Sequence, residues 1–177
     1  MAFSLKTLRE ERYLVPAKII LVYLGWKVFH HFTTVPGTAL HLWWAALCAH
    51  IGSWYASATS FILSLGGMST NADGININLL ASNKQIWVEE HCLAIPAMVV
   101  FTGTVLAFKG SPKDKAWFIP VGLVGIIVIN IIRLIFVSLA WVYLTPYFFN
   151  LHHSLIYAVI TYGFIFLMLR WWMKRQI

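Results

Sequence analysis

Three polar groups in an otherwise apolar chain have the residue types that acyl transfer requires. Cys92 stands where a polar loop over residues 66–91 ends and an apolar run begins. Arg133 lies well inside a later apolar run, and His152 and His153 stand at the start of the last one. A thiol is a nucleophile, an arginine stabilises an anion and a histidine moves protons. If the three groups converge, the sequence predicts a thioester-forming site.

Arg133 is the strongest of these signals. A charged side chain at the centre of a membrane span costs about 2.5–3.5 kcal/mol on insertion scales, so it usually faces the bundle interior and marks a function. Asn130 precedes it by three residues and therefore shares its helix face, where the amide can orient the guanidinium or bind a substrate carbonyl. The alternative is an arginine that snorkels to the outer interface.

Cys92 by itself indicates little, because single cysteines in membrane proteins are mostly small buried hydrophobes. Its position at the mouth of a predicted helix favours the thiolate, and a nearby Arg133 would lower the pKa of the thiol further. Glu89 and Glu90 oppose ionisation unless they point away or pair with Arg133. The other cysteine, Cys48, falls in the middle of an apolar run and is predicted to be a buried free thiol.

The doubled histidine leaves two candidates for proton transfer. Either His152 or His153 could act as general base toward the cysteine and general acid toward a leaving amine, and we favour His153. The alternative is a pair of interfacial histidines without a role. Four other histidines are interpreted as interfacial or packing residues: His30, His31, His41 and His50. No Cys/His spacing typical of zinc sites is present in the sequence, so neither a metal nor a cofactor is predicted.

The composition is that of an integral membrane protein. Of the 177 residues, 60% are hydrophobic and 11% are charged, whereas soluble domains carry about a quarter charged residues. The mean hydropathy is +0.75. The net charge of +7 comes mainly from two tails and one short loop. Since cytoplasmic ends of membrane proteins have this pattern, nucleic acid is excluded as a partner. No cleavable signal peptide is evident.

The predicted fold is all-α: a polytopic transmembrane helical bundle forming one domain over residues 1–177. A basic tail, residues 1–13, precedes a segment over 14–33 that lysines interrupt, so that it either spans or lies in the interface. Residues 66–91 combine turn chemistry with period-two alternation and predict a short β-hairpin outside the lipid before Cys92. Four apolar runs are clear spans: residues 39–65, 92–108, 117–144 and 154–173.

Helix rise places the three reactive groups at one height. We expect the basic loop 109–115 and the C-terminal tail to be cytoplasmic, which makes residues 66–91 and 145–153 extracytoplasmic. At about 1.5 Å per residue, Cys92 and His153 each lie roughly 26 Å, and Arg133 roughly 27 Å, from the basic end of their helices. This height is close to the outer edge of a hydrocarbon core of about 30 Å.

The same reasoning creates a conflict at the N-terminus. If residues 14–33 and 39–65 both span, the basic tail lies outside, against the charge rule. A re-entrant or interfacial first segment removes the conflict, and so does an exceptional orientation in which Glu10 and Glu11 partly offset the bases.

The ordered residues resemble the exosortase/archaeosortase family of membrane cysteine transpeptidases. The similarity covers about residues 60–175, and the order of the motifs is more specific than any one of them. The motifs are Glu90-x-Cys92-Leu93-Ala94-Ile95-Pro96, Asn130-Ile131-Ile132-Arg133 and His152-His153. Family members commonly have glycine soon after the cysteine, whereas this chain has Ala94. The chain resembles the compact variants that lack an appended soluble domain.

The resemblance implies a bacterial inner-membrane thiol protease or transpeptidase with its active site on the extracytoplasmic side. Its partners would be exported proteins with a C-terminal sorting signal, meaning a motif, one transmembrane helix and a basic tail, embedded in membrane lipid. The acceptor would be water or an amine on a lipid or glycan. Carried over by position, Cys92 matches the nucleophile, Arg133 the arginine and His153 or His152 the histidine. Asn130 and Glu90 are candidates for substrate binding.

The rival hypothesis belongs to another class of protein. A non-enzymatic membrane subunit would use its histidines to anchor haem or quinone, or would be a small transporter with Arg133 on the pathway. A haem anchor predicts facing histidines on two spans and a visible absorption band. An enzyme predicts selective reaction of Cys92 with electrophiles.

Overall fold

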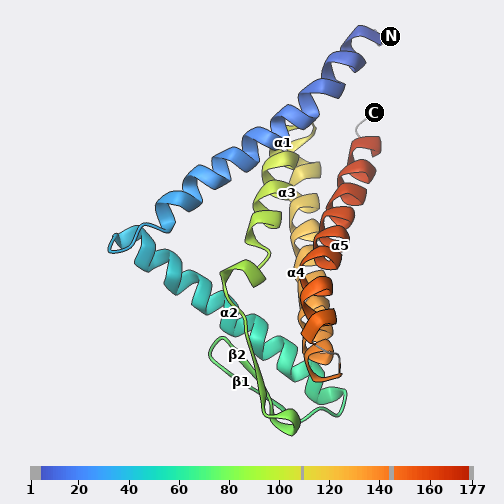
Figure 1. Cartoon of the computed structure of the whole chain (residues 1–177). Coiled ribbons are helices and arrows are strands. Elements are labelled where there is room, and N and C mark those ends of the chain that lie inside the picture. Colours follow the sequence, from blue (N-terminus) through green and yellow to red (C-terminus); the bar gives the residue numbers. More distant parts are fainter. Residues whose placement is uncertain (1–4, 109, 144–145, 176–177) are drawn as a thin grey trace.

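The computed structural model describes residues 5–108, 110–143 and 146–175, with only the backbone of 5–16, 146–158, 173 and 175. Most of these residues are helical, as predicted, and a small sheet lies between the second and third α-helices (Figure 1). The elements in chain order are α1 (Leu5–Thr33), α2 (Ala39–Leu65), β1 (Thr70–Asp73), β2 (Asn76–Leu79), η1 (Leu80–Ser82), β3 (Lys84–Trp87), η2 (Glu90–Cys92), α3 (Ile95–Ala107), α4 (Pro112–Tyr143) and α5 (Pro146–Arg175).

Aromatic and basic side chains gather where α3 ends, α4 begins and α5 ends. Phe118 of α4 stacks on Trp172 of α5 with ring centroids 5.7 Å apart, and Phe108 meets the same indole edge-on. Lys115 donates to the carbonyls of Leu106 and Phe108, which the end of α3 leaves without helical partners. At the same level, Trp117 and Trp171 lie edge-on to each other and are partly exposed, and surface tryptophans beside lysines are typical of a membrane interface.

Helix α1 runs antiparallel along α3 and starts from this same end. Lys18 donates to the carbonyl of Ala107 at 2.8 Å. Further along, Val22 packs on Gly103, where an added Cβ would come within 2.6 Å of the valine side chain. At the far end, His30 reaches Glu90 just before α3. The segment that lysines interrupt is therefore a long helix packed against the bundle.

The corner between α1 and α2 sets the direction in which α2 runs. Figure 1 shows α1 descending from the end that holds both termini, and α2 continuing away from that end toward the sheet instead of returning. The turn is held by Thr38, which caps α2, and by His41, whose Nδ1 donates to the carbonyl of Thr33 at 2.9 Å. The helix end nearest the basic tail, the loop before α4 and the C-terminus thus lie at one end of the molecule.

Helix α2 covers one face of the sheet, which lies at the end away from the termini (Figure 1). Its buried residues form one stripe, which includes Tyr55, Ala56 and Thr59. Gly52 permits the closest approach, because a Cβ there would lie 2.8 Å from the carbonyl oxygen of Val88. The 39–65 segment is thus a helix, as predicted, and it packs against the sheet, α4, α1 and η2.

The predicted hairpin is a three-stranded antiparallel sheet in the order β1-β2-β3. The alternating residues 75–79 predicted β2, and Gly74, at φ +56°, makes the turn before it. The third strand, Lys84–Trp87, follows Asn83 in the left-handed conformation. Ile77 and Ile86 are paired across β2 and β3 and point into the core.

The outer surface of the helices is strongly apolar, as expected of a protein surrounded by lipid. Leu21, Leu65, Phe136 and Tyr143 are all at least 67% exposed. Among the described residues, one helix, Pro112–Tyr143, is long and apolar enough by itself to cross a membrane. Shorter apolar helices cover Ile95–Ala107 and Val159–Trp172, so the four predicted spans are not confirmed.

Two predicted boundaries are wrong in a way that affects the site. The aromatic residues after Pro146 were predicted to form a loop, but α5 begins at Pro146 and includes His152 and His153. Proline at a first helical position needs no N–H partner, which explains this start. Cys92 was predicted to open a helix, but it ends the 3₁₀ turn η2, and α3 begins three residues later at Ile95.

Candidate active site

Cys92 lies in a tight turn between the sheet and α3. Its backbone N–H donates to the carbonyl of Glu89 at 2.8 Å, which closes the turn. Only 4% of the residue is exposed, and its sulfur forms no disulfide bond. The turn thus presents one buried thiol at the junction between the sheet and α3.

Asn130 holds this turn from the neighbouring helix. Its Nδ2 donates to the carbonyl oxygen of Cys92 at 2.7 Å, and Asn130 is fully buried. Before the structure, the amide was expected to orient the guanidinium of Arg133 or to bind a substrate carbonyl. In the structure it fixes the backbone of the cysteine, so Asn130 is a positioning residue for the thiol.

Arg133 reaches the thiol from one turn further along α4, in hydrogen-bonding contact with it. Burial raises the pKa of Cys92, while the charge of Arg133, a backbone hydrogen bond from Glu89 and the hydrogen bond from Arg133 lower it. Burial outweighs the other effects, and the pKa is raised from its ordinary value. The predicted net fall in the pKa is therefore wrong, although Arg133 acts in the predicted direction.

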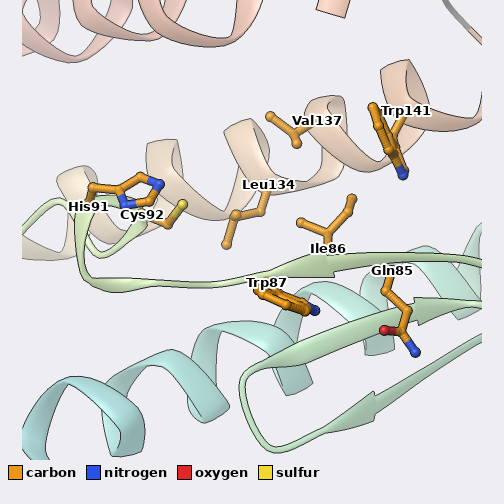
Figure 2. A pocket seen from close by; sticks show the side chains of 8 residues that line it. All are labelled: Gln85, Ile86, Trp87, His91, Cys92, Leu134, Val137 and Trp141. Carbon is orange, nitrogen blue, oxygen red and sulfur yellow. The ribbon is translucent and has the colours of Figure 1, made fainter. Parts of the chain in front are cut away.

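A cavity of about 290 Å³ opens beside the thiol. Figure 2 shows it between strand β3 on one side and helix α4 on the other, with Cys92 and His91 at one end and Trp141 at the other. Its eight lining residues are Gln85, Ile86, Trp87, His91, Cys92, Leu134, Val137 and Trp141. Most of its lining residues are apolar, so the thiol lies at one end of a largely apolar cavity.

His91 is a candidate that sequence reasoning missed. It lines the cavity next to Cys92, with 67% of its side chain exposed (Figure 2). Its Nδ1 lies 3.6 Å from a carboxylate oxygen of Glu89, which can hold the ring in place. Direct adjacency to the cysteine in sequence is the signal that could have identified it.

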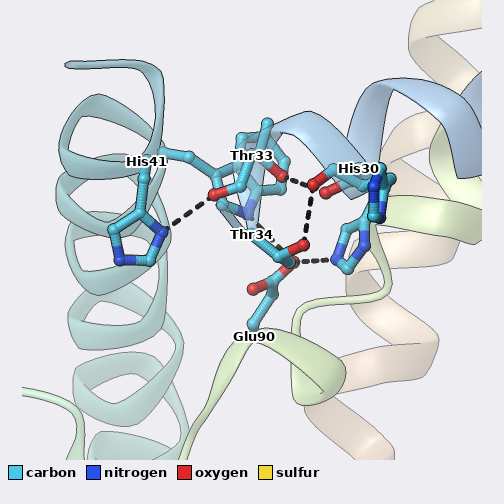
Figure 3. A network of polar contacts seen from close by, with 7 residues as sticks. His30, Thr33, Thr34, His41 and Glu90 are labelled. Carbon is cyan, nitrogen blue, oxygen red and sulfur yellow. Dashed lines mark hydrogen bonds and ion pairs between the residues drawn. The ribbon is translucent and has the colours of Figure 1, made fainter. Parts of the chain in front are cut away.

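Glu90 points away from the cavity into a polar network (Figure 3). Its Oε1 accepts from Trp44 Nε1 at 2.9 Å and lies 2.6 Å from His30 Nε2. The turn that carries Cys92 is thereby tied to the end of α1 and the start of α2. His30, interpreted from sequence as an interfacial or packing residue, thus supports the site indirectly, and so does Trp44.

His152 and His153 lie in the first turns of α5, and their side chains lie outside the described part of the structure. The level of the backbone follows from the antiparallel register of α4 and α5, in which Trp117 meets Trp171 and Gly125 meets Phe164. Continued along both helices, this register places positions 152 and 153 about one helical turn beyond the level of Arg133. The backbone of α5 therefore carries both histidines near the height of the thiol.

Ala94 has the left-handed conformation, with φ 57° and ψ 18°. This conformation costs a residue with a Cβ about 1–2 kcal/mol and costs glycine nothing comparable. The backbone must turn sharply here because η2 ends and α3 begins within three residues. Ala94 adopts this conformation although a glycine would adopt it at lower cost.

Comparison with known proteins supplies one match. A family model described as a transmembrane exosortase matches residues 12–171, which is most of the chain. No curated protein and no solved structure is significantly similar to this chain.

Proposed function

Because this chain belongs to the transmembrane exosortase family, we propose that it is a membrane cysteine transpeptidase or protease with Cys92 as nucleophile. The observation that carries the proposal is the contact of Arg133 with the Cys92 thiol at the end of an apolar cavity. A cation beside a buried thiol stabilises the thiolate, which is the reactive form. A cysteine and an arginine that only stabilised the fold would not need to border a cavity.

In the first step, the Cys92 sulfur bonds to the carbonyl carbon of the scissile peptide. The C–N bond to the downstream segment then breaks, and the thiol proton passes by way of a histidine to the leaving amine. The thioester is resolved when an amine or water attacks the same carbon. The C–S bond then breaks, and the proton of that nucleophile returns to the sulfur. Arg133 stabilises first the thiolate and then the oxyanion of each tetrahedral intermediate.

The histidine that moves the proton is proposed to be His153, with His152 as the alternative on the same helix turn. The level of the α5 backbone supports both. His91 is a third candidate because it borders the cavity beside Cys92. Burial favours the protonated thiol, so the site needs a base more than an exposed cysteine would.

The proposed substrate is an exported protein with a C-terminal sorting signal, cut at the outer face of the bacterial inner membrane. Such a substrate is held in the membrane by its own helix until cleavage separates it. The gathering of basic and aromatic groups at the end away from the sheet supports an orientation with the cavity outside. The acceptor would be water or an amine on a lipid or glycan.

The test is processing of a reporter that carries the C-terminal 60 or so residues of a tailed protein from the same genome. Cys92→Ala, Arg133→Ala and His153→Ala should each lose at least about 100-fold in rate, as expected for groups that act in the transition state. Cys48→Ser is the matched control, since Cys48 is also buried and free but lies in α2. Normal processing by Cys92→Ala would show that the covalent mechanism is wrong.

Comparison of His91→Ala, His152→Ala and His153→Ala assigns the proton-transfer role. The histidine whose loss slows processing more than it slows alkylation of Cys92 is the one that protonates the leaving amine, because alkylation needs a base for the thiol but no leaving amine.

A further inference from the structure

The sheet beside the thiol ends in an unpaired edge. The strand order β1-β2-β3 makes β3 an outer strand, and within residues 5–108, 110–143 and 146–175 no further strand pairs with it. An open strand edge offers N–H and C=O groups that another extended chain can bind. This edge borders the cavity, because Gln85, Ile86 and Trp87 all line it.

The register identifies which backbone groups face outward. Val88 N–H donates to the carbonyl of Ile75 at 2.9 Å, so these two residues are a hydrogen-bonded pair at the end of the β2–β3 ladder. Antiparallel pairs alternate between hydrogen-bonded and non-hydrogen-bonded types. Since Trp87 pairs with Asn76 and Gln85 with Asn78, both are non-hydrogen-bonded positions. The N–H and C=O of Gln85 and Trp87 therefore point away from β2.

The cavity also has two defined ends. At the outer end, Lys84 Nζ donates to the Trp141 carbonyl at 2.7 Å and lies over the Trp141 ring, which joins β3 to α4. At the inner end lie His91 and Cys92 (Figure 2). Leu134 and Val137 form the opposite wall. The resulting trough has a hydrogen-bonding edge, an apolar wall and a nucleophile at one end.

We propose that the substrate segment before the scissile bond binds in this trough as an added strand on β3, with an apolar side chain against Leu134, Val137 and Trp141. This inference rests on the proposed function and names how that substrate is held. Backbone pairing supplies affinity independent of side chains, and alternate side chains enter the apolar wall, where they set specificity.

The direction of the added strand follows from the position of the thiol. Strand β3 runs toward η2 and Cys92. A substrate whose membrane helix follows the scissile bond must run from the outer end of the trough toward Cys92. The added strand is therefore parallel to β3, with Gln85 and Trp87 as its backbone partners.

The first experiment removes one outward N–H. Gln85→Pro deletes the outward donor and leaves the β2–β3 ladder intact, because proline is tolerated on an edge strand whose N–H faces outward. Its matched control is Gln85→Ala, which loses only the side chain. We expect Gln85→Pro to process the tailed reporter at least about tenfold more slowly, while iodoacetamide labels Cys92 at the wild-type rate. Equal processing by the two variants, with labelling preserved in both, would overturn the strand addition.

A cross-linking experiment decides the question without turnover and serves if Gln85→Pro does not fold. In a Cys48→Ser, Cys92→Ala chain, Gln85→Cys is oxidised with reporters that carry one cysteine at successive positions before the scissile bond. We expect cross-links at every second position, because alternate side chains of a strand share a face. Asn71→Cys, exposed on the opposite edge strand β1, is the control.

The outcomes of the two proposals are separable. If Cys92→Ala processes the reporter normally, the proposed chemistry fails whatever the cross-links show. If Cys92→Ala is inactive but cross-links from Gln85→Cys have no period of two, or do not exceed those from Asn71→Cys, strand addition fails and the chemistry stands.

Discussion

The bond from Asn130 to the Cys92 carbonyl makes the sharpest prediction about the site. Asn130→Leu keeps the branched shape and the number of side-chain heavy atoms, and it removes the donor from a fully buried contact of 2.7 Å. A buried carbonyl left without its partner costs about 1–3 kcal/mol, so the free energy of unfolding should fall by that amount. The turn that carries the thiol also becomes free to shift, and a displacement of about 1 Å at a reacting group costs about 100-fold in rate.

Two measurements check this prediction in detergent-purified protein: unfolding by denaturant and processing of the tailed reporter. Ser138→Ala is the matched control, because Ser138 is equally buried in α4 but donates only to Leu134 of its own helix. We expect Ser138→Ala to lose at most about 1 kcal/mol and to process normally. If Asn130→Leu matches Ser138→Ala in both measurements, the amide does not position the nucleophile.

Three further predictions concern the groups around the thiol. Because burial raises the pKa of Cys92 and only the thiolate reacts, the alkylation rate of Cys92 should keep rising at pH values above those at which ordinary thiols are fully ionised. Arg133→Gln should raise that pKa further. Alkylation of this variant should be slower than that of the wild type at pH 8 and should reach the wild-type rate only at higher pH. Glu90→Ala should lower the unfolding free energy by about 1–3 kcal/mol, since Trp44 Nε1 loses its acceptor, whereas Glu90→Gln should lose less; equal losses would contradict the network. Ala94→Gly should be at least as stable as wild type, and Ala94→Val less stable in the same denaturant titration, because φ is positive there.

The common level of Cys92 and Arg133 could be predicted because a helix has a fixed rise. Counting from the basic ends placed Cys92 and Arg133 at one height, and the structure brings them into contact. The count succeeded because α4 continues unbroken through Pro120 to Tyr143. Turn residues and period-two alternation likewise predicted a strand before the cysteine, at β2.

Other features depend on contacts between distant segments, so no local pattern shows them. The local sequence around Glu90 does not indicate whether its carboxylate faces a substrate or His30. Its partner is determined by the packing of α1 near the end of the sheet. The third strand is four residues long and pairs on one side only, so its alternation is too short to stand out. The path of α2 past the sheet depends on close packing at Gly52.

Some properties of the Cys92 site follow from the sequence, and others follow only from the fold. The sequence alone determined the membrane setting, the helical class and the order of cysteine, arginine and histidines, because composition, helix rise and motif order are all properties of the chain itself. Only the tertiary structure decided that Asn130 binds the cysteine backbone, that His91 borders the cavity and that burial raises the pKa of the thiol. These depend on what surrounds each group, and hydrogen bonding and desolvation act through space between residues that lie far apart in the chain.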